Sequence, residues 1–151
     1  LLLSRIDNGQ FPETEDTCLD VLIRKHGSIC NEIFSDKEIC TDYKTDDSNI
    51  SVRTNGTLAE ILISNLIRNA VIHSPHGSRI AISLKKDRFV IRNSGNIALN
   101  KERIFEPFYQ GCKKEGTTGL GLALCKTIAK RYDMRLDYSF EDGMHCFCLT
   151  F

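Results

Sequence analysis

The chain has 151 residues, of which 41% are hydrophobic and 26% are charged, and its formal net charge is zero. This length and composition are typical of one globular domain with a real core. Without net charge there is no electrostatic reason to expect binding to nucleic acid or to an anionic membrane. No apolar stretch approaches the roughly 20 residues of a membrane-spanning helix, and Leu1–Leu3 is too short for the core of a signal peptide.

The cysteines are odd in number and irregularly spaced, which argues against a disulfide scaffold and favours a reducing cytoplasm. They are Cys18, Cys30, Cys40, Cys112, Cys125, Cys146 and Cys148. Cys146 and Cys148 stand two apart in a predicted strand, where alternate residues share a face. A shared face explains this spacing better than a metal site does.

The first third of the chain is predicted to hold two helices and two strands. Residues 1–10 resemble the end of a helix that arrives from outside the chain, so we expect a longer protein. Apolar residues at helical spacing predict a helix over 18–34, interrupted near Gly27. Residues 38–44 and 49–53 are predicted as short strands separated by a polar turn.

The rest of the chain is predicted to alternate between helices and antiparallel hairpins. In chain order the predicted elements are a long helix over 57–73, a hairpin of 79–85 with 89–91, a short helix over 101–108, a mobile loop over 110–118, a helix over 119–132, and a hairpin of 135–140 with 145–151. Helices interleaved with hairpins predict an α/β two-layer sandwich.

Asn65 and Asn69 stand four residues apart in the long predicted helix, so they share one face about one turn apart. Apolar residues lie on the same face, and a buried amide without a partner costs about 1–3 kcal/mol. A ligand or a hydrated metal ion is one source of partners. Backbone groups or water inside the core are the other, and the residues alone leave both open.

Three further segments carry polar chemistry, each with an ordinary structural explanation beside the functional one. Gly116-Thr-Thr-Gly-Leu-Gly-Leu122 precedes a predicted helix, where glycines and free N–H groups favour an anion such as phosphate. Its ordinary explanation is a helix-entry turn, which is common. It is not a Walker A loop, because the lysine of that motif does not follow. Asn93-Ser-Gly95 follows a predicted strand and is either a turn or a way to present one side chain to a flat ligand. His73 ends the long helix, where histidine is often structural.

In this order and spacing, the segments resemble the ATP-binding catalytic domain of sensor histidine kinases, a branch of the GHKL ATPases. The resemblance covers residues 11–151, with residues 1–10 similar to the tail of a dimerisation helix and its linker. Residues 65–74 resemble the N box of the family, 90–95 the G1 box, 104–109 the F box and 119–123 the G2 box. The resemblance implies a Bergerat-type fold, in which a mixed, mainly antiparallel sheet packs on one layer of helices.

The resemblance also implies roles for individual residues. Asn69 would bind the Mg²⁺ that bridges the ATP phosphates, and residues 110–118 would form a lid over the nucleotide. Asn93 takes the place of the aspartate that usually accepts a hydrogen bond from the adenine amino group. The implied nucleotide-binding residues are Asn65, Asn69, His73, Asn93, Gly95, Thr118, Gly119, Leu120 and Gly121.

Several positions depart from the pattern of the family. Asn93 is neutral, and a neutral acceptor makes a weaker hydrogen bond than a carboxylate does. Ile97 and Thr117 stand where the boxes usually have glycine, and Ile72 stands where the family is often basic. We therefore expect weaker ATP binding than in a member with complete boxes.

The N box also bears on the reaction. Water-activating members of the superfamily carry a general-base glutamate four residues before the metal-binding asparagine, and here that position is Asn65. An amide cannot take a proton at neutral pH, which disfavours hydrolysis and leaves phosphoryl transfer, a reaction that depends on positioning and charge neutralisation. None of the four histidines precedes an acidic residue, as phosphoacceptor histidines in this family do. We expect the chain to bind Mg-ATP without phosphorylating itself.

The implied partners are the dimerisation and phosphoacceptor domain of the same protein and a downstream response regulator. The full-length protein is expected to be a homodimer, with this domain on the cytoplasmic side of a membrane-anchored bacterial sensor. Two alternatives remain. A degenerate, non-catalytic GHKL module is favoured by the neutral G1 box and the missing glycines. A kinase of the anti-sigma-factor type would phosphorylate a serine on a protein partner.

Overall fold

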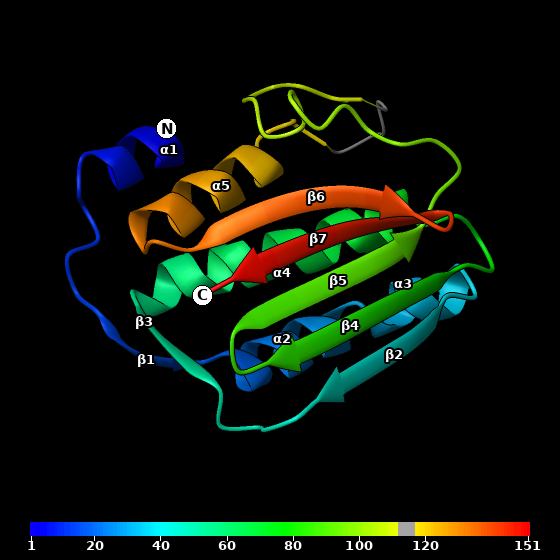
Figure 1. Ribbon diagram of the computed structural model, residues 1–151, viewed down its shortest axis with the longest axis horizontal. Coiled ribbons are helices and arrows are strands. Elements are labelled where there is room, and N and C mark those ends of the chain that lie inside the picture. The colour runs from blue at the N-terminus through cyan, green and yellow to red at the C-terminus, as the bar shows by residue number, and fades with distance from the viewer. Residues whose placement is uncertain (112–116) are drawn as a thin grey trace.

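The structure is a computed structural model that describes residues 1–111 and 117–151. Its main feature is a five-stranded sheet with helices packed on one face (Figure 1). Across the sheet the strands are β2 (Cys40–Thr45), β4 (Arg79–Lys85), β5 (Arg88–Ser94), β7 (Met144–Thr150) and β6 (Arg135–Glu141). β2 and β4 are parallel, and the other neighbours are antiparallel. The predicted α/β two-layer sandwich is confirmed.

The helical layer packs its apolar faces on one side of this sheet, with α2 (Leu19–Ile29), α4 (Gly56–His73) and α5 (Gly121–Arg131) lying together behind the strands in Figure 1. Alternate residues of the central strands face these helices and are fully buried, as Phe89 and Phe147 show. Burial of this shared face is the main stabilising term of the fold. No helix among the described residues is both long and apolar enough to cross a membrane.

The N-terminal segment is anchored to α5. Helix α1 (Leu2–Asp7) buries Ile6, and Arg131 of α5 donates hydrogen bonds to the backbone oxygens of Ile6 and Phe11, each at 3.0 Å. A two-stranded antiparallel sheet follows, made of β1 (Glu15–Cys18) and β3 (Ser51–Thr54). The sequence did not predict β1.

Two predicted features were wrong. The helix that begins at Leu19 passes through Gly27 without a break and ends before Cys30, after which α3 (Asn31–Asp36) follows. A glycine inside a helix costs only about 1 kcal/mol, which the burial of this helix outweighs. Residues 101–108 form a series of turns with no helix. Of the predicted lid over 110–118, residues 112–116 lie outside the described part of the chain.

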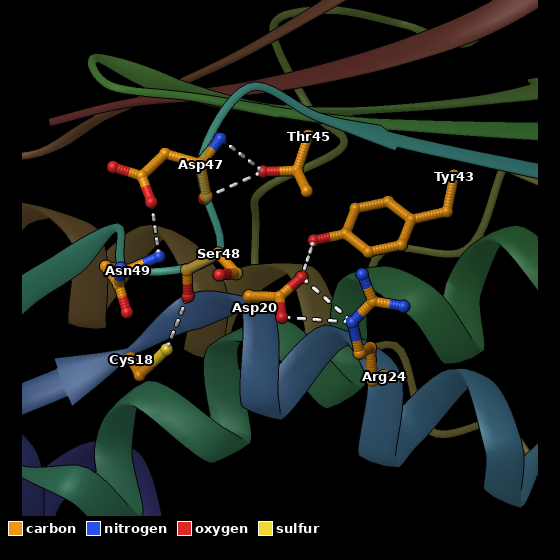
Figure 2. Close-up of polar contacts among 8 residues, drawn as sticks. All are labelled: Cys18, Asp20, Arg24, Tyr43, Thr45, Asp47, Ser48 and Asn49. Atoms are coloured by element: carbon orange, nitrogen blue, oxygen red, sulfur yellow. Dashed lines mark hydrogen bonds and ion pairs between the residues drawn. The ribbon is translucent and has the colours of Figure 1, made fainter.

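A buried polar cluster joins α2 to the edge strand β2 (Figure 2). Asp20 accepts a hydrogen bond from the Tyr43 hydroxyl at 2.6 Å and another from Arg24 Nε at 3.0 Å. Burial opposes the ionisation of Asp20, but these hydrogen bonds outweigh it and hold the pKa of its carboxyl below the usual value. Burial, together with the bond to Asp20, raises the pKa of the Tyr43 hydroxyl, which therefore stays a donor at neutral pH.

Tyr43→Phe is expected to lower the free energy of unfolding by about 1–2 kcal/mol at pH 7, because it removes a hydrogen bond to a buried carboxylate. Since the pKa of Asp20 is depressed in the folded state, its contribution is complete above the unfolded pKa of about 4 and is lost as the pH falls through the lower folded pKa. Urea unfolding at pH 7 and pH 3 measures both effects. Tyr109→Phe is the control, since its hydroxyl bonds to no other described residue; an equal loss in the two variants would contradict the prediction.

Candidate nucleotide-binding site

Helix α4 is held at both ends. Its first turn is capped by Asn55, whose side-chain oxygen accepts a hydrogen bond from Leu58 N at 3.2 Å. At the other end the Lys37 ammonium donates to the backbone oxygens of Val71, Ile72 and Ser74 at 3.0–3.2 Å. A cation there complements the negative end of the helix dipole. The positions of the polar residues on this helix are therefore well defined.

Asn65 of α4 lies close to Gly121, the first residue of α5. The Asn65 amide nitrogen donates to the Ile61 oxygen of its own helix at 2.8 Å. Its side-chain oxygen faces Gly121, where a Cβ atom would lie only 2.9 Å from it. A backbone partner within the helix therefore accounts for the amide nitrogen of Asn65 but not for its oxygen. The same contact places the first residue of α5 directly against the polar face of α4.

Asn69 lies one turn further along α4 and differs from Asn65 in its partners. It is half-buried, and its side chain makes no hydrogen bond to any residue in the ranges 1–111 and 117–151. Its amide oxygen is therefore available to a cation. Those ranges contain no cluster of three or more acidic, histidine or cysteine side chains suited to a metal ion, so a bound ion would need other oxygen ligands.

The end of β5 carries a further amide, that of Asn93, at the end of the domain where α4 ends. Asn93 is 2% exposed and shares the helix-facing side of β5 with Phe89 and Ile91. Helix α4 ends at His73, which is half-buried, and β4 begins a few residues later and pairs Ile80 with Asn93. This short connection places Asn93 at the end of the sheet next to the last turn of α4.

A histidine that the sequence reasoning missed supports this strand end. His145 pairs with Asn93 across β5 and β7, and its Nε2 lies 2.1 Å from where a Cβ of Gly95 would be. Its Nδ1 lies 2.7 Å from the Tyr138 hydroxyl, which accepts a hydrogen bond from Leu99 N at 2.9 Å. Burial lowers the pKa of His145, so the ring is neutral at pH 7. Its only signal in the sequence was its position two and four residues before Phe147 and Leu149, on the buried face of β7.

The glycine turn before α5 lies close to the backbone of Phe108. Gly119 has φ of +74°, and its oxygen accepts a hydrogen bond from Phe108 N at 2.9 Å. Leu120 precedes α5 and gives it no side-chain cap, so the N–H groups of its first turn have no side-chain acceptor among the described residues. Thr118 is exposed beside them. An uncapped helix start of this kind favours an anion such as phosphate.

The predicted residues come from three separate segments at one end of the domain, which are α4, the end of β5 and the turn before α5. The amide of Asn69 and the start of α5 suit a phosphate group with a cation, and the buried amide of Asn93 suits the edge of a flat ligand. Glu60, the acidic residue of α4, forms an ion pair with Lys25 and a hydrogen bond with His26 of α2. It lies on another face of the helix and cannot act as a base beside Asn65.

A family model described as histidine kinase-, DNA gyrase B-, and HSP90-like ATPase matches residues 54–151. The chain belongs to this ATPase family. Its match begins at the end of β3 and includes α4, the β4–β5 hairpin, α5 and the last hairpin, which are the elements that carry every residue of the site described above.

Individual relatives narrow the identification within this ATPase family. The heme sensor protein HssS of Staphylococcus saprophyticus is 35% identical over 135 residues, covering 85% of this chain and 29% of HssS. The sensor-like histidine kinase SenX3 of Mycobacterium tuberculosis is 33% identical, covering 87% of this chain and 34% of SenX3. The chain therefore spans about a third of the length of these relatives.

The fold agrees with these relatives. The solved catalytic domain of histidine kinase ThkA, in a nucleotide-free form, has a TM-score of 0.83 at 24% identity and covers 91% of this chain and 94% of its own. The chain is accordingly a catalytic, ATP-binding domain of the sensor histidine kinase type.

Proposed function

We propose that this domain binds Mg-ATP and delivers the γ-phosphoryl group to a histidine on a dimerisation domain outside this chain. The observation that carries the proposal is the contact between Asn65 and Gly121, which sets the uncapped start of α5 against the polar face of α4. Within residues 1–111 and 117–151, the Asn69 amide oxygen has no hydrogen-bond partner and no carboxylate lies on that face of α4 to deprotonate water. The site therefore suits transfer to a partner better than hydrolysis.

The residues present fit a magnesium ion. Mg²⁺ prefers oxygen ligands and keeps several waters, so one amide oxygen together with phosphate oxygens is a sufficient set. Asn69 would supply the amide oxygen, and the ion would neutralise charge on the phosphates. The backbone N–H groups from Gly119 to Gly121 would bind the phosphate oxygens, and Thr118 and His73 would contact the same groups. Asn93, beside Gly95, would contact the base.

Each of these residues acts by positioning. The start of α5 holds the phosphate chain, and Asn65 fixes the distance between that start and Asn69 through its bond to Ile61. The incoming imidazole comes from the partner domain. Since phosphoryl transfer requires alignment and charge neutralisation more than covalent chemistry by the protein, these contacts are enough to support it.

The partners follow from the relatives. ThkA has been solved in complex with response regulator protein TrrA, and we propose a response regulator as the downstream partner of this protein too. The phosphoacceptor histidine would lie on the dimerisation domain of the same protein, which would act as a homodimer. HssS is named as a sensor protein, and this domain would form the cytoplasmic part of a membrane-anchored sensor.

Asn69→Ala is expected to weaken binding of Mg-ATP at least tenfold, because it removes the amide oxygen offered to the ion. Isothermal titration with ATP, with and without Mg²⁺, measures the effect. Asn49→Ala, in the loop between β2 and β3, is the matched control and should bind as the wild type does. Binding that is equally tight in all three proteins would contradict the proposed role of Asn69.

The transfer step has its own test. The chain is mixed with the phosphoacceptor domain of its full-length protein and labelled ATP, and acid-labile, base-stable phosphate on that domain is the expected product. A second candidate, a non-catalytic nucleotide-binding module, is favoured by the exposed Ile97, which stands where the family has glycine. That module would bind ATP in this assay and transfer nothing.

A further inference from the structure

The amide of Asn93 is buried but not fixed in orientation. Its nitrogen lies 3.4 Å from the oxygen of Ser94, beyond the 2.7–3.2 Å of an ordinary N–H···O hydrogen bond. Its oxygen has no hydrogen-bond partner in the part of the chain that the structure describes. Asn93 is 2% exposed, its nitrogen is held only by this long bond, and its oxygen is open to a ligand or water. Either orientation of its two ends is open.

The strand neighbours of Asn93 carry no charge that would select one orientation. Its neighbours across the sheet are Ile80 and His145. Leu99 N donates to the Tyr138 hydroxyl, and that hydroxyl can in turn donate to Nδ1 of the neutral His145 ring. The nearest cation on the strand, Arg92, is exposed on the opposite face of β5.

An amide in such a place can pair with two kinds of purine. Towards adenine, its oxygen accepts from the 6-amino group while its nitrogen donates to N1. Turned by 180°, its nitrogen donates to a 6-oxo group while its oxygen accepts from N1–H. A carboxylate can accept from the amino group of adenine but has no donor for a 6-oxo group, which it repels. A site that leaves such a group unpaired rejects it strongly.

We propose that Asn93 makes this site accept 6-oxopurine nucleotides, those of hypoxanthine and guanine, as well as ATP. The inference rests on the proposed function in taking Asn93 as the residue that contacts the base. It goes further in the substrates it allows, because the phosphoryl donors of the kinase would then include inosine and guanosine triphosphates. Asn93 is in this reading the residue that determines base specificity.

Titration with ATP and inosine triphosphate (ITP) in the presence of Mg²⁺ tests the proposal, since these nucleotides differ only at position 6 and at N1. The wild-type affinities for the two are expected to lie within about tenfold of each other. In Asn93→Asp, ATP binding should strengthen and ITP binding should weaken, changing their ratio at least tenfold. Asn96→Asp adds the same charge in the exposed loop just beyond β5 and should leave the ratio unchanged.

The wild-type ratio tests the proposal without any variant, and thermal unfolding without nucleotide shows whether Asn93→Asp is folded. A wild-type preference for ATP above about a hundredfold would overturn the inference and leave the proposed function intact. An unchanged ratio in folded Asn93→Asp would do the same. Failure of every nucleotide to bind would overturn both, and a shift of equal size in Asn96→Asp would assign the effect to charge alone and overturn the role of Asn93.

Discussion

Gly95→Ala is expected to lower the free energy of unfolding by about 3 kcal/mol, because the added methyl group would occupy the place of the His145 ring. The new Cβ would lie 2.1 Å from Nε2 and 2.4 Å from Cδ2 of that ring. The ring cannot move aside freely, since Tyr138 holds Nδ1 and the ring packs between Tyr138 and Phe140, with centroids at 5.9 and 4.9 Å. Overpacking of this kind costs about 1–3 kcal/mol, and a lost buried hydrogen bond adds to it.

Urea unfolding of Gly95→Ala beside Gly27→Ala measures this loss. Gly27 is a helical glycine with no atom within 4 Å of its added Cβ, so alanine there should stabilise the domain by about 0.5–1 kcal/mol. Removing the ring should relieve the clash, so Gly95→Ala with His145→Ala should cost less than the sum of the two. Additive losses would show that the ring and position 95 do not meet.

Gly119→Ala is expected to cost about 2–3 kcal/mol and to weaken Mg-ATP binding at least tenfold. The residue has φ of +74°, which costs an alanine about 1–2 kcal/mol. Its Cβ would also lie 2.8 Å from the carbonyl carbon of Phe108 and 2.9 Å from its Cα, and these backbone atoms cannot turn away as a side chain would. The turn would open, and the start of α5 would lose its place against Asn65.

Gly77→Ala separates the cost of backbone strain at positive φ from the cost of the close approach to Phe108. Gly77 has nearly the same φ, +72°, but no atom lies within 4 Å of its added Cβ, so that variant should show the backbone strain alone. Chemical unfolding and ATP titration of both variants give the comparison. If Gly119→Ala lost no more stability than Gly77→Ala and bound nucleotide normally, the approach to Phe108 would not hold the turn.

Much of the fold could be predicted because its main helices and strands have a clear pattern of apolar and polar residues within their own segments. Residues 79–85 and 145–151 alternate between apolar and polar residues, and the apolar members are the ones that face α4 and α5. Strand β1 could not be predicted in this way. Its residues Glu15–Cys18 are half-exposed or exposed, and it forms only because β3, more than thirty residues later, pairs with it. Pairing partners at that distance have no local signal.

The candidate site likewise has a part that local sequence patterns predict and a part that depends on contacts between distant segments. Four-residue spacing was enough to place Asn65 and Asn69 on one face of α4. It could not show that Gly121 would approach Asn65 and leave Asn69 open, because that contact joins two distant helices. His145 and Tyr138 were missed for a related reason. Their meeting with Asn93 and Leu99 depends on the register of β5, β7 and β6, which no single segment contains.

The contact between Asn65 and Gly121 also ties together two positions more than fifty residues apart. With 2.9 Å between the Asn65 oxygen and the place of a Cβ at 121, a larger residue at either position requires a smaller one at the other. Since Asn69 stands one turn beyond Asn65, the spacing of this pair sets the distance from the start of α5 to the amide that we propose as the metal ligand.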